Sequence, residues 1–297
     1  MDNAQSAIFI EGTTHNRFLE FSVKEGVPLD KAKTAIAGAL AGDLENTMKA
    51  PHVVWGFGRS LATSLFGTDT PSDLLDFSHY GSGDNKAAAT QRDIFLWIHG
   101  NHEDEVFDCA RQHYQCLNAI CEIALEITGF KYKNNHDLIG FEDGTANPKS
   151  DEARADAALT DAGGSILLTQ KWVHDLKKFE AVPILEQEKI VGRTKYENLE
   201  LEGEAMPLTS HVSRTDVDIE GVAQKVYRRS APFGNLQEHG LYFVSFAKEI
   251  QRHDIQLKRM FGETDDGLKD RLTEFSTATT GSYWYIPPIA QLNTLRD

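Results

Sequence analysis

The sequence has few cysteines and no long hydrophobic run. Its three cysteines are Cys109, Cys116 and Cys121 among 297 residues. An odd number without a Cys-x-x-Cys spacing argues against a disulfide framework and against a zinc site, so we expect small buried or half-buried side chains on one helix in a reducing compartment. No apolar run approaches the about 20 residues of a membrane-spanning helix. The first residues show neither a signal peptide nor a twin arginine, so we expect a cytoplasmic protein.

Basic residues are also scarce. Lysine and arginine number 30 against 45 acidic residues, and the formal net charge is −15. A surface of this kind repels phosphate backbones and anionic lipids, so neither nucleic acid nor a membrane is an expected partner. A dianionic cofactor stays compatible with this charge, because a few local arginines can override the global field.

The chain instead has enough apolar residues for a sizeable core, since 40% of its residues are hydrophobic. Its length fits one large or two modest domains. Short apolar segments with strand character alternate with amphipathic segments. One long helix is expected over residues 103–127, with Gly129 at its end and the three cysteines on it. The other expected helices are 28–40, 182–190, 251–261 and 267–274, and the expected strands are 6–10, 17–23, 52–58, 93–99, 165–173, 222–229, 241–247 and 282–286.

A repeated order of elements suggests that the chain is built from two similar halves. Residues 94–99 form a buried strand that leads through a short polar link into an amphipathic helix, and residues 241–246 do the same. This repeat fits two ferredoxin-like halves, each an antiparallel sheet with helices packed outside, and therefore an α+β fold. We place the division at the polar segment after residue 134, which gives domains at 1–134 and 135–297, with the segment as a functional loop.

The most unusual segment is Gly140-Phe141-Glu142-Asp143-Gly144-Thr145-Ala146-Asn147-Pro148. Two glycines bracket an acidic pair, and glycine permits backbone angles and close approaches that other residues do not. An asparagine before proline favours an extended or turn geometry. The segment therefore reads as a tight loop that presses a carboxylate against a neighbouring group. An ordinary acidic surface turn is the alternative.

The nine residues together resemble the signature of dye-decolorizing peroxidases, the Gly-x-x-Asp-Gly haem enzymes. The resemblance covers almost the whole chain, most densely from residue 140 to 285, and the length is similar to the bacterial B or P branch. It implies a dimeric α+β barrel type of fold, one haem b per chain, hydrogen peroxide and a small-molecule electron donor as substrates, and a homo-oligomer. The C-terminal residues show no clear motif for docking into an encapsulin shell, so encapsulation is not expected.

The resemblance implies that His211 is the axial ligand of the haem iron. The histidine lies in the context Ser210-His211-Val212-Ser213-Arg214, which is similar to that of the family's proximal histidine. Most of the other ten histidines are expected on the surface or in structural positions. An axial imidazole usually donates its second N–H to a carboxylate. Asp270 matches the family's position for that carboxylate, and a solvated aspartate on an amphipathic helix is the alternative.

On the opposite side of the haem, the resemblance assigns proton transfer to Asp143 and places the backbone of Gly144 against the porphyrin. Peroxide cleavage also needs a cation to stabilise the developing charge. Strand alternation favours Arg228, because Arg229 shares its face with the more solvent-like Tyr227 and Lys225, and the family pattern also selects Arg228. Ser230 stands where one branch of the family has asparagine, so it is a weaker candidate. Glu142 is expected to point elsewhere and to be dispensable.

The resemblance also implies a basic partner for the haem propionates. Arg193, in Gly192-Arg193-Thr194-Lys195, is the candidate, and an arginine that faces a helix C-terminus is the alternative. Phe243 or Phe246 is expected to line the pocket, and periodicity does not decide between them. A carboxylate titrates lower than a histidine, so Asp143 as the proton carrier implies an acidic pH preference.

Two other functions remain open at this point. Chlorite dismutase-like enzymes share the architecture but lack the Gly-x-x-Asp-Gly loop. A haem-binding or haem-handling protein with incidental peroxidase activity is the non-enzymatic alternative.

Overall fold

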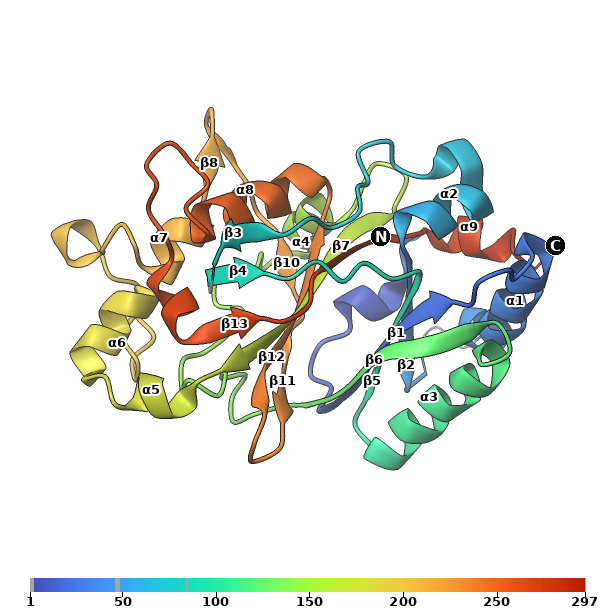
Figure 1. Ribbon diagram of the computed structural model, residues 1–297, viewed down its shortest axis with the longest axis horizontal. Helices are drawn as coiled ribbons and strands as arrows, with labels where there is room; N and C mark the ends of the chain where they lie inside the picture. The colour runs from blue at the N-terminus through green and yellow to red at the C-terminus, as the bar shows by residue number, and fades with distance from the viewer. Residues whose placement is uncertain (1–2, 46–48, 84, 297) are drawn as a thin grey trace.

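The computed structural model describes residues 3–45, 49–83 and 85–296. The described chain alternates strands with helices in two successive sets (Figure 1). The first set contains β1 (His15–Val23), α1 (Leu29–Glu45), β2 (His52–Phe57), α2 (Arg59–Phe66), β3 (Tyr80–Ser82), β4 (Asn85–Ala87), β5 (Ile94–Gly100), α3 (Glu103–Leu117) and β6 (Cys121–Phe130). The second contains α4 (Asp151–Ala158), β7 (Ser165–His174), α5 (Leu176–Glu180), α6 (Ile184–Val191), α7 (His211–Thr215), β8 (Asp218–Ile219), β9 (Val222–Ala223), β10 (Tyr227–Arg228), β11 (Ala231–Gly234), β12 (His239–Ala247), α8 (Ile250–Met260), β13 (Ser276–Ala278), β14 (Ser282–Ile286) and α9 (Ile289–Asn293).

Each set forms a four-stranded antiparallel unit with the same strand order. In the first set the order is β6-β1-β5-β2, and in the second it is β14-β7-β12-β11. Numbered along the chain within each set, both read fourth, first, third, second. This is the order of a ferredoxin-like β-α-β-β-α-β unit, so the predicted α+β fold with two ferredoxin-like halves is confirmed.

The two units close on each other as a barrel. Strand β2 pairs with β14 at Phe57 and Tyr285, and β6 pairs with β11 at Gly129 and Phe233. Since β7 also pairs with β12, the eight strands form a closed antiparallel ring without a free edge. Helices α1, α2, α3 and α9 gather at one end of the molecule, and α5, α6 and α7 gather at the other (Figure 1).

The seam at Gly129 explains why a glycine stands there. A Cβ at this position would come within 3.0 Å of Ala231 Cβ and of Phe18 Cε2. The close approach of β6 to β11 therefore needs a residue without a side chain. The prediction that Gly129 ends a helix is wrong, because it lies inside strand β6.

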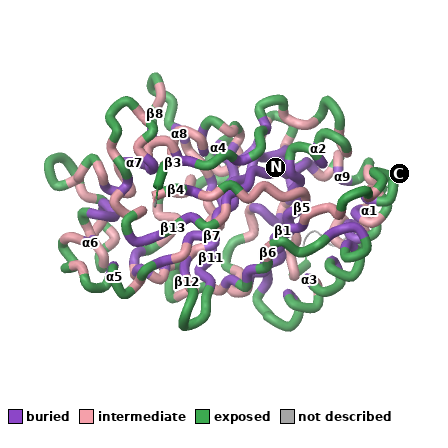
Figure 2. The backbone as a smooth tube through the Cα atoms, in the orientation of Figure 1, coloured by how far each residue is buried: buried purple, intermediate pink, exposed green. Residues whose placement is uncertain are grey.

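The barrel interior is filled by large aromatic side chains around one carboxylate. Phe18, Trp97, Tyr242 and Trp284 are each at most 1% exposed. Glu20, also 1% exposed, accepts a hydrogen bond of 2.6 Å from the Tyr242 hydroxyl. Residues on the other face of the same strands pack against the outer helices, and Figure 2 shows buried backbone concentrated along the central strands.

The predicted long helix over residues 103–127 is wrong in its second half. Helix α3 ends at Leu117, and β6 begins at Cys121. Apolar residues continue at helical spacing beyond Leu117, but pairing of β6 with β1 overrides the local pattern. Cys109 and Cys116 therefore lie on α3 and Cys121 lies on β6, and all three are free thiols.

Three further predictions need correction. Residues 6–10 are not a strand, because Ser6–Phe9 forms a short 3-10 helix whose carbonyl groups are bound by side chains from distant elements. Residues 222–229 are not one strand, because β9 and β10 are separated by a break at 224–226. In the predicted helix 267–274, only Arg271–Glu274 is helical, with Asp270 as its N-cap.

The other predicted elements agree with the structure. The helix that follows Pro28 is α1, and the helix that ends at Gly192 is α6, where Gly192 has φ +95°. The predicted strands at 17–23, 52–58, 93–99, 165–173, 241–247 and 282–286 correspond to β1, β2, β5, β7, β12 and β14.

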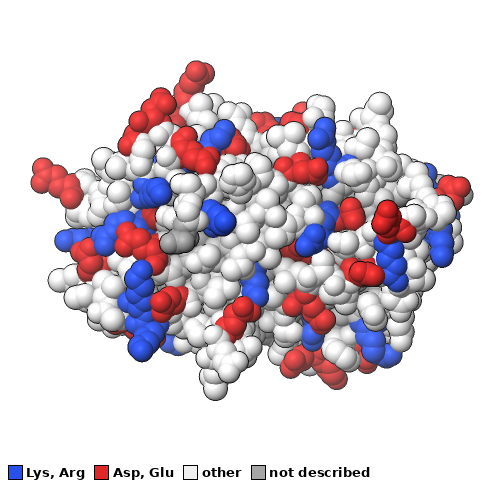
Figure 3. All heavy atoms as spheres, viewed as in Figure 1, with Lys and Arg blue, Asp and Glu red and all other residues white. Residues whose placement is uncertain are grey.

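The described helices are all too short or too polar to cross a lipid bilayer. On the face in Figure 3, acidic and basic side chains are interspersed around an uncharged central area.

Candidate active site

An apolar cavity lies in the C-terminal unit between the sheet and the helices. Its floor is the outer face of β7 and β12, with Leu168, Trp172, Leu241 and Phe243. Helix α8 covers it with side chains that include Leu257. Phe243 therefore lines the cavity, while Phe246 points into the barrel, where its ring centroid lies 6.2 Å from that of Trp97. The alternation along β12 separates these two residues.

His211 lines this cavity from the first residue of α7. Ser210 caps that helix by accepting a hydrogen bond from Ser213 N, which fixes the backbone at His211. The Nδ1 atom of His211 lies 2.6 Å from Oδ2 of Asp270, and Asp270 is 0% exposed. Asp270 Oδ1 accepts from Leu272 N, so the carboxylate itself is held in place. A hydrogen on Nδ1 leaves Nε2 of His211 as a lone-pair donor.

Two other histidines line the cavity, but their nitrogen atoms are engaged differently. His174 contacts Ser276 Oγ with Nδ1 at 2.6 Å and Asp137 Oδ1 with Nε2 at 3.1 Å. His253 is 2% exposed and contacts the Ile166 carbonyl through Nε2, and burial lowers its pKa to about 4. Of the three, His211 is the one that combines a buried carboxylate partner with an available Nε2.

Arg214 holds α7 in place through contacts with the end of α8 and the loop after it, and the sequence analysis assigned it no role. Its guanidinium donates to both carboxylate oxygens of Asp266 at 2.7 and 3.0 Å and to the Arg259 carbonyl at 2.9 Å. The side chain is only 1% exposed, and it holds the pKa of Asp266 well below its ordinary range. Arg214 therefore ties the short helix that carries His211 to the end of α8. The signal was present in the Ser-His-x-x-Arg context.

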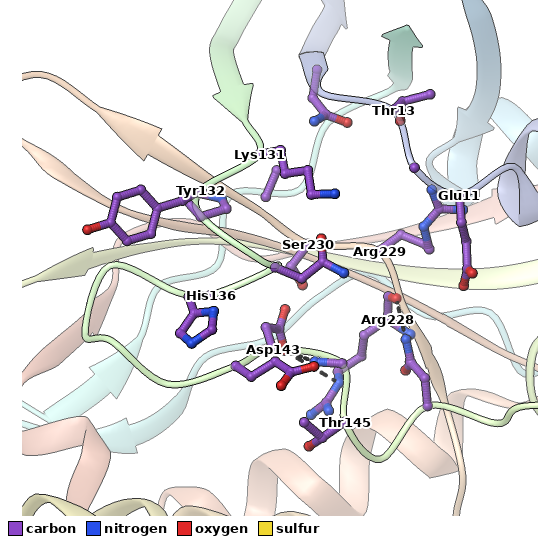
Figure 4. Close-up of a pocket in the computed structure, with 18 of the residues that line it drawn as sticks. Glu11, Thr13, Lys131, Tyr132, His136, Asp143, Thr145, Arg228, Arg229 and Ser230 are labelled. Carbon is purple, nitrogen blue, oxygen red and sulfur yellow. Dashed lines mark hydrogen bonds and ion pairs between the residues drawn. The ribbon is translucent and has the colours of Figure 1, made fainter. Parts of the chain in front are cut away.

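Asp143 and Arg228 stand together on another wall of the apolar cavity. Figure 4 shows the same pair in a neighbouring polar pocket that both residues also line. Arg228 Nε lies 4.0 Å from Asp143 Oδ1, and the two side chains are 18% and 27% exposed. Asp143 Oδ1 accepts a hydrogen bond of 2.7 Å from Gly144 N. Gly140 and Gly144 have φ of +90° and +78°, so both glycines of the motif take left-handed backbone conformations that let the loop turn. The structure thus brings Asp143, Arg228 and His211 to one cavity.

A second, polar cavity lies on the outer side of the same pair. Asp143, Glu142 and Arg228 line both cavities, so they form the partition between them. Lys131, Tyr132 and His136 surround the outer cavity, as Figure 4 shows.

Arg229 and Ser230 face this outer cavity rather than the apolar one. Arg229 is not directed at solvent as expected: its guanidinium donates to the carbonyls of Ile8 and Ile10 and lies 5.0 Å from the Trp97 ring centroid. Burial lowers its pKa. Ser230 Oγ accepts from Val244 N at 3.3 Å. Arg228 is therefore the one of the three that reaches the apolar cavity.

Arg193 is held within its own loop. Its guanidinium donates to Asn198 Oδ1, to the Asn198 carbonyl and to Glu200 Oε2 at 2.6 to 2.8 Å. It does not line either of the two cavities formed by the described residues. A role with the cofactor stays a prediction for Arg193. Asn198 Nδ2 also donates to Glu142 Oε2 at 2.7 Å, which joins this loop to the signature loop.

The donor set of the apolar cavity fits an iron porphyrin. A neutral imidazole backed by a buried carboxylate is a strong axial ligand for haem iron. The cavity walls beside it are largely apolar, as a porphyrin ring requires, and Asp143 and Arg228 add a carboxylate and a guanidinium to the same cavity.

The comparisons with known proteins agree with this geometry. Residues 5–131 match the family model "Dyp-type peroxidase, N-terminal" and residues 134–291 match "Dyp-type peroxidase, C-terminal". A dye-decolorizing peroxidase of Mycobacterium tuberculosis is 32% identical over 245 residues, which cover 80% of this chain and 73% of the relative. A Dyp-type peroxidase structure from Shewanella oneidensis superposes with a TM-score of 0.93 at 30% identity, covering 99% of each chain. A Rhodococcus jostii DypB variant in complex with heme gives 0.88 at 30% identity, covering 96% of each chain.

The fold and these matches define a peroxidase built on a barrel of two ferredoxin-like units. The chain belongs to the Dyp-type peroxidase family.

Proposed function

We propose that this protein is a haem peroxidase that reduces hydrogen peroxide with one haem b bound in the apolar cavity. The observation that carries the proposal is that one apolar cavity is lined by His211, which is backed by Asp270, and by the Asp143–Arg228 pair. The family matches support the same activity and cofactor. When bound, haem would supply the iron at which the peroxide O–O bond is cleaved, and the oxidised haem would then take electrons one at a time from the donors.

His211 would hold the iron through Nε2, because Nδ1 is the atom that contacts Asp270. Its hydrogen bond to Asp270 orients the ring and gives the imidazole more anionic character, which favours the oxidised metal. The buried position of Asp270 strengthens this effect, because a carboxylate removed from water interacts more strongly with its partner.

Asp143 carries the proton. Its carboxylate would accept a proton from one oxygen of hydrogen peroxide and return it to the other oxygen, which would leave as water. The guanidinium of Arg228 stabilises the negative charge that develops on the leaving oxygen. Gly144 lies beside Asp143 on the outer cavity and adds no side chain there, and its place against the porphyrin stays a prediction. We also propose an acidic pH preference, because carboxylates as a class titrate lower than histidines and so can still accept a proton at an acidic pH at which a histidine base would already be protonated.

The test is peroxide titration of the haem-loaded protein, followed by its absorption spectrum. We expect a rapid spectral change in the wild type and a loss of at least about 100-fold in rate in Asp143→Ala and Arg228→Ala. Wild-type rates in both variants would contradict the roles proposed for Asp143 and Arg228. A turnover rate that rises steadily from about pH 4 to pH 8 would contradict Asp143 as the sole base.

We also propose the domain division at 1–134 and 135–297 and a homo-oligomeric state. The limits of the two family matches support the first. Exposed apolar side chains on and near α6 support the second, namely Leu185, Tyr196, Leu199 and Leu208. The two alternative functions, a chlorite dismutase-like enzyme and a haem-handling protein, are not favoured, because both family matches are to peroxidase domains. A small-molecule electron donor and a cytoplasmic location remain predictions.

A further inference from the structure

The side-chain amide of Asn147 binds both main-chain polar groups of Arg228. Nδ2 donates to the Arg228 carbonyl at 2.8 Å, and Oδ1 accepts from the Arg228 N–H at 3.0 Å. Arg228 ends the two-residue edge strand β10, which pairs with β12 on its other side. A primary amide carries the same donor and acceptor as a peptide group, so Asn147 acts as the missing neighbouring strand.

The same residue also fixes the loop that carries Asp143. Asn147 N donates to the Gly144 carbonyl at 3.0 Å, and Gly144 N donates to Asp143 Oδ1 at 2.7 Å. A Cβ added to Gly144 would lie 3.3 Å from Asn147 Nδ2, so the turn and the amide are closely packed. Asn147 therefore links the backbone of the loop that carries Asp143 to the backbone of Arg228.

We propose that Asn147 is a positioning residue that sets the separation of Asp143 and Arg228. The proposal rests on the peroxidase function above and on the roles given there to these two residues. Without the amide, the N–H and carbonyl of Arg228 lose their partners on the open edge of β10. The preceding residues 224–226 are not in a strand, so they do not hold β10 in place. A shift of about 1 Å in a catalytic group can cost roughly 100-fold in rate.

Two substitutions separate positioning from simple stability. Asn147→Ala removes both hydrogen bonds, and we expect the peroxide reaction to slow by about 10-fold or more while haem stoichiometry and the unfolding midpoint stay near wild type. Asn147→Asp keeps the acceptor for Arg228 N but, when ionised, turns an oxygen towards the Arg228 carbonyl. A protonated aspartic acid again has one donor and one acceptor. The rate of the peroxide reaction in Asn147→Asp is therefore expected to approach the wild-type rate as pH falls.

The control is Asn235→Ala, which removes another side-chain amide that holds main-chain groups. Asn235 Oδ1 accepts from Gln237 N and Glu238 N in the exposed turn between β11 and β12, and Asn235 lines neither cavity. The titratable and charged groups that line the outer cavity with Asn147 are the same in the wild type and in both Asn147 variants, namely Glu11, Lys131, Tyr132, His136, Glu142, Asp143, Lys149, Arg154, Arg228 and Arg229.

The experiment measures, in each haem-loaded variant, the rate of the peroxide reaction from pH 4 to pH 8 and the affinity of the ferric form for cyanide. Both are expected to be impaired in Asn147→Ala and unchanged in Asn235→Ala. For Asn147→Ala, the ratio of its rate to the wild-type rate is expected to be independent of pH. Wild-type rates in Asn147→Ala, or a deficit in Asn147→Asp that does not narrow at low pH, would overturn the inference. If Asn147→Ala does not bind haem, the pH profile of Asn147→Asp alone decides.

Asp143→Ala and Arg228→Ala are measured in the same experiment. If neither variant slows the reaction, the proposed function fails, whereas normal rates in Asn147→Ala alone reject only the positioning role.

Discussion

The Nδ1 atom of His211 lies 2.6 Å from Oδ2 of Asp270, and that carboxylate has no exposure to solvent. The pair joins α7 to the turn before Arg271–Glu274, two segments about sixty residues apart in the chain. In the function proposed above, this hydrogen bond would set how strongly the imidazole of His211 donates to the haem iron.

Asp270→Asn tests this pair. The amide keeps a side-chain oxygen to accept from Leu272 N but removes the negative charge, so the imidazole of His211 becomes a weaker donor. We expect haem affinity to fall by about 10- to 100-fold. The iron–histidine stretching frequency in resonance Raman spectra of the ferrous protein is expected to fall as well. Asp265→Asn, an exposed neighbour, is the control. Unchanged frequency and affinity would show that Asp270 does not tune His211.

Gly129→Val tests the closure of the barrel. Branched carbons at this position would collide with Ala231 and Phe18, which lie 3.0 Å from the place of a Cβ. We expect a loss of about 1 to 3 kcal/mol in the free energy of unfolding. Gly38→Ala, on α1 with no heavy atom within 4 Å of the added Cβ, is expected to be neutral or to stabilise by up to about 1 kcal/mol. Chemical unfolding of both variants measures the difference, and equal stability would argue against a tight seam.

Glu20→Gln tests the carboxylate inside the barrel. Burial raises the pKa of Glu20 to about 7 from an ordinary value of 4.5. The folded protein therefore binds the proton more tightly than the unfolded chain, so this group stabilises the fold fully below pH 4.5 and loses that contribution as pH rises to about 7. The loss is on the order of 3 kcal/mol.

The amide variant carries no titrating group and keeps an oxygen for the Tyr242 hydroxyl. We expect its urea midpoint to change less between pH 5 and pH 8 than that of the wild type. Glu105→Gln, at an exposed position on α3, should leave the wild-type dependence intact. A wild-type pH dependence in Glu20→Gln would mean that another group is responsible.

Ser230→Ala tests whether this residue takes part in peroxide cleavage. Its hydroxyl is bound to Val244 N and lies on the outer cavity, away from His211. We expect the rate of the peroxide reaction to change by less than about 3-fold, against at least about 100-fold for Asp143→Ala. A large loss in Ser230→Ala, measured by stopped-flow absorbance, would place the hydroxyl in the reaction.

Much of the fold was predictable because buried strands such as 94–99 and 282–286 carry their own apolar pattern. The end of α3 was not, because the residues after Leu117 keep a helical spacing and become a strand only through pairing with β1. The site motif around Asp143 was recognisable from its local sequence. The contribution of Arg214 was not, since its role depends on Asp266 and Arg259, which the fold brings close from about fifty residues away. The solvent-facing expectation for Arg229 failed for the same reason, because its partners are carbonyl groups near the N-terminus.

The central claim is that His211 holds the haem iron, and His211→Gly with added imidazole tests it most directly. The measurement is the iron–imidazole signature in the resonance Raman and absorption spectra of the haem-loaded variant. We predict that the signature disappears in His211→Gly and returns when imidazole fills the space left by the side chain. An unchanged signature in the variant without imidazole would contradict the account.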